Sequence, residues 1–462
     1  MNINILSNSP TRVNSGFGIT TRNLALGLTK LGHNVSVSDM QNIYNKEYWN
    51  NITIYPMNSV QNATTGSEFY ITELKQLQNN IKDSKAEVLI ILYPSYDNVV
   101  VSNHLHELHK NTIWYYPVEG ENIPKVYTDE LSKVIKIIPL TKQGKHELEK
   151  SGLNNIHNEI YHGFDPNIFH KLDINNKDNK ELHYCIWNQS KYMNMQDAKW
   201  LCKNGCFDCS GYNNSCKSYD EEKITINLMK NEFTGKISNI ANIKDEFGVE
   251  TIISFTGENN GTRKKIDRLI ASYSMIKKLD KNNEIMLIMH TMPVSNNGIN
   301  LWDVINKHKL NYMDNKLMFT YGTDDLGNSW SDAALNILYN VSDINISTSS
   351  AEGFGMPTLE SMACDVCNVG PNFSSFIELI GNDENIENNR GLLSDIQGYE
   401  KLSNGMKRAL VSPKSTAENV IMLHEDKKLM KKLSNNAYEW SKQYTWDNIS
   451  EKFNDLLLNI EI

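Results

Sequence analysis

The chain has 462 residues, which is enough for two or three domains of ordinary size. Its composition, 40% hydrophobic and 22% charged, is typical of a soluble globular protein, and no apolar run is long enough to span a membrane. The net charge of −9 disfavours a nucleic acid partner, although a local basic cleft would still be compatible with one. The amino terminus lacks the parts of a signal peptide, so we expect a cytoplasmic, reducing environment.

The first 35 residues predict a strand, a loop, a helix and a second strand. Residues 15–18 contain two glycines and are expected to form a turn, and residues 20–31 have leucines at helical spacing. This βαβ pattern brings a glycine loop to the start of a helix, which is a place where phosphate can bind. Gly16 and Gly18 are therefore candidate ligand-binding residues.

Three further strands are expected at residues 88–93, 112–117 and 135–140. Glu119 directly follows the second of them. Loops at the carboxyl ends of parallel strands line the cleft of such a domain. Glu119 is therefore a candidate for binding the acceptor substrate of a transfer reaction or for accepting a proton. The alternative is an ordinary carboxylate of a surface loop.

A group of cysteines follows the first α/β pattern, in a segment of 171–250 that has no such pattern. Four thiols lie within fifteen residues, and closely spaced thiolates in a reducing compartment favour a tetrahedral zinc site. The alternative is a loop with free thiols, and Cys185 is a substitute ligand. The candidate zinc ligands are Cys202, Cys206, Cys209 and Cys216.

A second α/β pattern begins with the strand expected at residues 251–257 and the helix expected at residues 266–279. The turn between them carries Arg263 and Lys264. An arginine can clasp a phosphate with two N–H groups, and a lysine adds a point charge. The turn is thus a candidate phosphate site, and the alternative is a solvated basic turn.

Residues 343–348 alternate like a strand, and residues 349–360 then read as a turn leading into a helix. Gly353 and Gly355 allow a tight turn and the close approach of a ligand to the backbone. Pro357 suits the first position of the helix. The free N–H groups at that helix start favour an anion such as phosphate.

Two carboxylates flank this turn. Glu352 lies in the turn itself, where it could hold hydroxyl groups, and Glu360 is expected in the first helical turn, where it could accept hydrogen bonds from a ribose. The alternative is an ordinary strand-to-helix turn with two solvated carboxylates. Further along, Cys364 and Cys367 are expected to be small buried residues, residues 391–393 are expected to form a turn, and residues 446–458 form an amphipathic pattern.

The two glutamates have seven residues between them, including Phe354, Gly355, Met356 and Pro357. This spacing resembles the signature of the retaining GT-B glycosyltransferases of family four. In that family the first glutamate contacts the donor sugar and the second holds the ribose. The pair Arg263 and Lys264 is similar to the family's Arg-Lys pair, which neutralises the leaving diphosphate, and Gly16 and Gly18 are similar to its amino-terminal glycine loop. The family often has another arginine five residues before that pair, where this chain has Glu258.

The resemblance implies a GT-B fold with two doubly wound, Rossmann-like α/β domains facing a cleft. We expect an acceptor-side domain at 1–170, the Cys-rich insertion at 171–250, a nucleotide-sugar domain at 251–440 and a returning helix at 441–462. The implied reaction is metal-independent, retaining transfer from a UDP- or GDP-linked sugar to a glycan, lipid, protein or modified nucleic-acid base. The alternatives are a nucleotide-sugar epimerase on the same fold, or a non-catalytic scaffold that uses the Cys-rich insertion.

Overall fold

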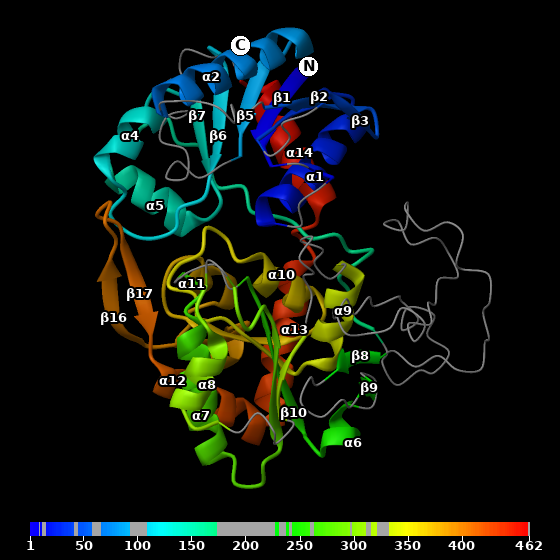
Figure 1. Ribbon diagram of the computed structural model, residues 1–462, viewed down its shortest axis with the longest axis vertical. Helices are drawn as coiled ribbons and strands as arrows, with labels where there is room; N and C mark the ends of the chain where they lie inside the picture. Colours follow the sequence, from blue (N-terminus) through cyan, green and yellow to red (C-terminus); the bar gives the residue numbers. More distant parts are fainter. Residues whose placement is uncertain are drawn as a thin grey trace, which may run out of the picture.

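The computed structural model shows two α/β domains, one above the other (Figure 1). It describes residues 1–8, 10–11, 15–40, 45–57, 66–92, 109–172, 227–230, 237–239, 243–258, 263–295, 298–310, 316–320 and 332–460. The four candidate zinc ligands and Cys185 lie outside the described residues, so the zinc site stays a prediction. No helix among the described residues is long and apolar enough to cross a membrane.

The amino-terminal domain is built on a seven-stranded sheet in the order β3-β4-β2-β1-β5-β6-β7. All neighbours are parallel except the edge pair β3 and β4. The order reverses between β1 and β5, which marks the carboxyl edge of those strands as the place for a ligand. The strands are β1 (Asn2–Ser7), β2 (Asn34–Asp39), β3 (Glu47–Trp49), β4 (Ile52–Pro56), β5 (Val88–Ile91), β6 (Thr112–Tyr116) and β7 (Lys136–Pro139).

The helices of this domain begin soon after the strands that they follow. They are α1 (Gly16–Lys30), α2 (Gly66–Ser84), α4 (Lys125–Leu131) and α5 (Lys142–Lys150). Helix α1 starts four residues earlier than the sequence predicts, because the hydroxyl of Ser15 caps it by accepting a hydrogen bond from the N–H of Gly18 at 3.2 Å. Gly16 and Gly18 therefore belong to the first helical turn and do not form a separate loop.

The carboxyl-terminal domain has a six-stranded parallel sheet in the order β12-β11-β10-β13-β14-β15. Its strands are continuous runs of buried residues, as expected where helices cover both faces of a sheet. The strands are β10 (Thr251–Thr256), β11 (Ile285–His290), β12 (Leu317–Phe319), β13 (Ile344–Ile346), β14 (Cys367–Pro371) and β15 (Gly391–Ser394). The predicted turn at residues 391–393 is wrong, because those residues belong to β15.

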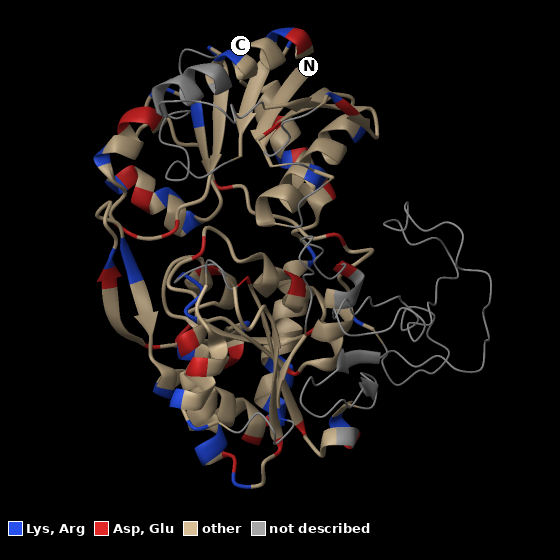
Figure 2. Cartoon of the chain, in the orientation of Figure 1, with Lys and Arg blue, Asp and Glu red and all other residues tan. Residues whose placement is uncertain are grey.

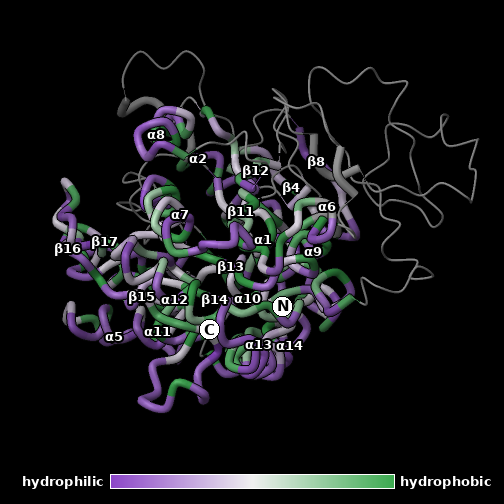
Figure 3. The backbone as a smooth tube through the Cα atoms, turned by 90° about the horizontal axis from the view of Figure 1, so that it is seen from below, coloured by the Kyte–Doolittle hydropathy of each residue, from purple (hydrophilic) through white to green (hydrophobic). Residues whose placement is uncertain are grey.

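Helices cover this second sheet. The tube of α13 and of the last helix, α14 (Trp446–Leu458), alternates between hydrophilic and hydrophobic segments, as amphipathic helices do (Figure 3). The helices of this domain are α6 (Ile243–Phe247), α7 (Ile266–Leu279), α8 (Leu301–Lys307), α9 (Asp332–Val341), α10 (Met356–Ala363), α11 (Ser375–Ile380), the 3₁₀ turn η5 (Ile386–Asn388), α12 (Pro413–Glu425) and α13 (Lys427–Ser441). A short antiparallel pair, β8 (Asn227–Lys230) and β9 (Ile237–Asn239), precedes them. As predicted, Cys364 and Cys367 are free and buried.

A hairpin that the sequence does not predict stands apart from both large sheets. Strands β16 (Ile396–Lys401) and β17 (Lys407–Val411) pair in an antiparallel fashion, with Glu400 opposite Arg408. Figure 1 shows the hairpin rising from the carboxyl-terminal domain to the edge of the amino-terminal one. Its charged positions consequently lie beside the junction of the two domains (Figure 2).

The chain crosses between the domains twice, and the two crossings lie side by side. The N–H of Phe164 donates to the carbonyl of Tyr444 at 3.0 Å, and the N–H of Trp446 donates to the carbonyl of Phe164 at 3.1 Å. Helix α14 (Trp446–Leu458) then packs against α1 and buries Phe453 among other residues. One hydrophobic cluster therefore continues from the first sheet into the second domain.

Candidate active site

The site is built around the start of helix α10, at the carboxyl end of β13. Gly355 precedes the helix with a φ of +102°, a left-handed conformation that glycine adopts without strain. The helix begins at Met356, so Pro357 occupies its second position and not the first. Proline loses nothing there, because the first N–H groups of a helix have no partner within it. The remaining N–H groups and the helix dipole favour an anion at this point.

Glu352 is buried in the turn before this helix and is paired with both cations of the β10–α7 turn. Arg263 donates to its Oε2, and Lys264 Nζ lies 2.6 Å from its Oε1. The hydroxyl of Ser349 also donates to Oε1, at 2.7 Å. Burial by itself would raise the pKa of Glu352, but the charges of Arg263 and Lys264 outweigh it and lower the pKa to about 2. The alternative of two solvated carboxylates is therefore wrong for Glu352.

The basic turn is held against the same loop by its backbone. The carbonyl of Arg263 accepts hydrogen bonds from the N–H of Ser350 at 2.8 Å and from its hydroxyl at 3.1 Å. The hydroxyl of Thr348 donates to the carbonyls of Lys264 and Lys265. The turn is thus not a freely solvated segment, and both of its cations pair with Glu352 just before α10.

A small pocket is lined by Lys264 and Glu352 together with the first residues of α10. Its wall combines a lysine, a carboxylate, a hydroxyl and the first residues of α10, so its chemistry suits a ligand that carries both anionic and hydroxyl groups. The lining residues are Phe255, Thr256, Lys264, Asn345, Ile346, Ser347, Ser349, Glu352, Gly355, Pro357, Thr358 and Phe376.

Glu119 reaches the same region from the other domain, at the carboxyl end of β6. Only 9% of it is exposed, so the surface-loop alternative is wrong. Its Oε2 accepts a hydrogen bond from Arg408 Nη2 at 3.1 Å, and its Oε1 lies 3.5 Å from Arg263 Nη1. Sequence reasoning missed Arg408, because nothing in the residues around it indicates that a hairpin would carry it into the cleft.

Glu360 lies deeper in helix α10, beyond its first turn, and is also buried. The hydroxyl of Tyr339 donates to its Oε2 at 3.3 Å. Burial raises the pKa of Glu360 to about 8, the charge of Asp332 adds to the rise, and the hydrogen bond from Tyr339 opposes it. A carboxyl group that accepts this one hydrogen bond among the described residues retains capacity to accept others from a ligand.

The starts of α1 and α10 face each other across the domain junction. The hydroxyl of Thr20 lies 4.0 Å from the sulfur of Met356, and a methyl group added at Gly16 would lie 3.7 Å from that sulfur. Gly18 is buried in the same first turn of α1. The resemblance to the signature implies that Phe354 is a donor-binding residue, but Phe354 packs in the core beside the aromatic rings of Tyr161 and His162.

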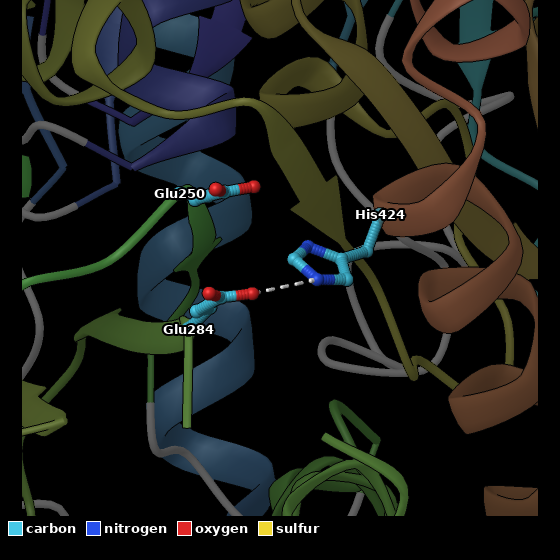
Figure 4. A group of neighbouring side chains, drawn as sticks. All are labelled: Glu250, Glu284 and His424. Carbon is cyan, nitrogen blue, oxygen red and sulfur yellow. Dashed lines mark ion pairs between the residues drawn. The ribbon is translucent and has the colours of Figure 1, made fainter. Parts of the chain in front are cut away.

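A different group of side chains has the composition of a metal site, and Figure 4 shows it. Glu250, Glu284 and His424 lie at the amino ends of β10 and β11, the opposite edge of the sheet from the pocket. His424 Nε2 lies 3.7 Å from Glu284 Oε2. The ammonium of Lys427 is 3.5 Å from the other ring nitrogen, and this positive charge opposes binding of a metal cation there.

Residues 241–440 match the family model described as "Glycosyl transferases group 1". A search of curated protein sequences finds no match. Among solved structures, the chain is similar to sucrose-phosphate synthase from Thermosynechococcus elongatus, with 13% identity, a TM-score of 0.66 and coverage of 99% of this chain and 98% of that one. A glycosyltransferase from Rickettsia africae shows 16% identity and a TM-score of 0.62, with both chains covered completely.

A third similar structure is the Anabaena protein HepE in complex with UDP and glucose. It shares 11% identity with this chain at a TM-score of 0.60, and both chains are covered completely. Similarity at this level of identity establishes the architecture, and the architecture is GT-B, as predicted.

Proposed function

We propose that the chain is a cytoplasmic, retaining glycosyltransferase that moves a sugar from a UDP- or GDP-linked donor to an acceptor without a catalytic metal ion. Two observations carry this proposal: Arg263 and Lys264 both pair with Glu352, and Lys264 and Glu352 line one pocket with the start of α10. The group 1 domain match over the same part of the chain supports it.

The donor diphosphate would lie at the start of α10. Arg263 and Lys264 would turn from Glu352 to the phosphates, because a diphosphate offers two negative charges where the carboxylate offers one. Negative charge grows on the leaving diphosphate as the bond to the sugar breaks, and fixed cations and helix N–H groups stabilise that charge in the transition state. These protein groups would supply the neutralisation that a metal ion supplies in other transferases.

The two glutamates of the turn would hold the two ends of the donor. Glu352, released from its cations, would accept hydrogen bonds from the sugar hydroxyls. Glu360 would accept hydrogen bonds from the ribose hydroxyls, at the carboxyl group to which the hydroxyl of Tyr339 donates in the structure. Glu119 would face the acceptor from the other domain, as an acceptor-binding or proton-accepting group.

The junction between the domains would exclude water from the reaction. Gly353 lies so close to the amino-terminal domain that a methyl group added to it would be 2.6 Å from Pro117 Cβ. Such a contact indicates a closed arrangement, in which the sugar would be transferred to the acceptor and not to water. With retention, the acceptor would attack on the face from which the diphosphate leaves, and the leaving phosphate would help to remove the acceptor's proton.

A panel of nucleotide sugars tests the proposal. UDP-glucose, UDP-N-acetylglucosamine, GDP-mannose and ADP-glucose are each added, and thermal unfolding is followed, since a ligand that binds only the folded state raises the melting temperature. We expect one UDP- or GDP-linked sugar to stabilise the chain with EDTA present. If none does, the proposal is refuted.

The products of the stabilising donor then decide the reaction. A transferase consumes the donor only slowly without an acceptor, whereas an epimerase releases free nucleotide and an altered sugar. The configuration at the anomeric carbon of the product, read by NMR, must equal that of the donor for a retaining enzyme. Inversion would refute the retaining mechanism while leaving the transferase assignment intact.

A further inference from the structure

The cleft contains a third cation that the proposed reaction does not yet use. Arg408, on strand β17, is buried, and its guanidinium holds Glu119 at two points. Its Nε donates to the carbonyl of Glu119 at 3.0 Å, and its Nη2 donates to the carboxylate at 3.1 Å. This paired contact joins the hairpin to the amino-terminal domain at the edge of the donor pocket.

Glu119 lies between two guanidinium groups. Its Oε2 is bound by Arg408, whereas its Oε1 lies 3.5 Å from Arg263 Nη1. Arg263 in turn reaches Glu352 and the carbonyl of Ala351. A chain of alternating charges thus runs from Arg408 through Glu119 and Arg263 to the donor pocket.

The hairpin is fixed firmly enough to place this arginine. The N–H of Ala409 donates to the carbonyl of Ser350 at 3.0 Å, so β17 lies along the loop that precedes α10. On its other side, Lys407 exchanges two backbone hydrogen bonds of 2.9 Å with Glu121 of the amino-terminal domain. Lys265 also pairs with Glu400 of β16 at 2.7 Å.

Glu119 would compete with the donor for Arg263 if Arg408 were absent. A buried carboxylate needs a cationic or hydrogen-bonding partner, because leaving it unpaired away from water is costly. Besides Arg408, the described residues place Arg263 in ion-pair distance of Glu119, at 3.5 Å. Without Arg408, Glu119 would hold Arg263 more strongly and so draw it away from the diphosphate.

We propose that Arg408 is a positioning residue that satisfies Glu119 and so leaves Arg263 available for the diphosphate of the donor. The proposal rests on the proposed function. It predicts that Arg408 matters for nucleotide binding only as long as Glu119 carries a negative charge.

A double-mutant cycle with UDP and GDP as the probes tests this coupling, with affinity measured by calorimetry. Arg408→Met is expected to weaken binding of the preferred nucleotide by roughly tenfold, the loss typical of a hydrogen bond to a charged group. Glu119→Gln alone is expected to bind at least as well as the unchanged chain. The double variant is expected to regain most of the lost affinity, since the neutral amide no longer competes for Arg263.

Lys407→Met is the matched control. It removes a cation from the same strand and an ion pair of 3.0 Å to Glu121. Among the described residues, the Lys407 side chain pairs with Glu121 and not with Arg263 or Glu119. We expect its nucleotide affinity to be unchanged. Equal losses in Lys407→Met and Arg408→Met would show that the hairpin acts only by holding the domains together, and would overturn the proposal.

The remaining outcomes are equally decisive. Unchanged nucleotide affinity in Arg408→Met overturns the inference. A double variant that binds the nucleotide as weakly as Arg408→Met also overturns it, because that result would mean that Arg408 contacts the nucleotide itself. If Arg408→Met does not fold, Arg408→Lys keeps the charge but loses the forked contact, and the same cycle with Glu119→Gln is expected to show weaker coupling. If the unchanged chain binds neither nucleotide, both the proposed function and the inference fail.

Discussion

Replacing Glu360 by glutamine is expected to stabilise the protein while weakening donor binding. Glu360 is only 6% exposed, and among the described residues its carboxyl group accepts a hydrogen bond from the hydroxyl of Tyr339. Burial raises its pKa from the ordinary 4.5 to about 8. The glutamine amide keeps a carbonyl oxygen for Tyr339 and never carries a charge, so the variant removes the cost of burying the ionised form.

The sign and size of the effect follow from the two pKa values. Because the pKa is higher in the folded state than in the unfolded state, the folded state holds the proton between pH 4.5 and about 8. The protonated Glu360 side chain therefore contributes fully to the free energy of unfolding below pH 4.5, and this contribution is lost as the pH rises through about 8. Each pKa unit of difference corresponds to about 1.4 kcal/mol, so the free energy of unfolding can change by at most roughly 5 kcal/mol. Relaxation of the protein and entry of water reduce the expected change to about 2–3 kcal/mol.

Thermal unfolding between pH 5 and pH 8.5 measures this difference. For a domain of 150–250 residues, 1 kcal/mol shifts the melting temperature by about 2–4 °C, so we expect Glu360→Gln to melt about 5–10 °C higher at pH 8 and close to the unchanged chain at pH 5. Glu451→Gln, at an exposed position of α14, is the control and should show no such trend. A difference that does not grow with pH would refute the burial argument, and undiminished nucleotide affinity would refute the ribose role of Glu360.

Three further predictions concern the pocket, the junction and the cysteines. Lys264→Ala and Glu352→Ala should each reduce the rate of sugar transfer at least about 100-fold, because each removes a charge aimed at the reacting centre. Circular dichroism should show that both variants are folded. Near-normal rates in the folded variants would contradict the assignment of the site. Gly353→Ala should open the domain junction and increase the radius of gyration in X-ray scattering, whereas Gly398→Ala, which adds a methyl group in open space, should not. Metal analysis of protein purified without added metal should return roughly one zinc per chain, and its absence would remove the proposed site of Cys202, Cys206, Cys209 and Cys216.

Local patterns were sufficient to predict the elements that carry the pocket. The continuous apolar runs gave the strands to within a few residues, and helix α7 begins and ends at the predicted residues, Ile266 and Leu279. The spacing of two glutamates around a glycine and a proline indicated the turn before α10. These features depend on neighbours in sequence, so the sequence displays them directly.

Features that depend on distant partners escaped prediction. Glu352 was expected to hold hydroxyl groups, yet in the structure two cations from a turn about 90 residues earlier occupy it. Glu119 looked equally suited to a surface loop, and only its burial against Arg408 removed that alternative. Phe354 stands within the signature but packs into the core, because the crossing segment brings Tyr161 beside it.

The sequence alone determined that the chain forms two α/β domains and that one helix start, flanked by carboxylates, can bind an anion. Those properties follow from periodicity, from the backbone freedom of glycine and from the missing partners at a helix terminus. Only the tertiary structure decided which charges meet there, because the sign and strength of an electrostatic contact depend on distance and burial, and neither is written in the order of residues. The hairpin that carries Arg408 into the cleft is the plainest case: its strands are local, but its place between the two domains is not.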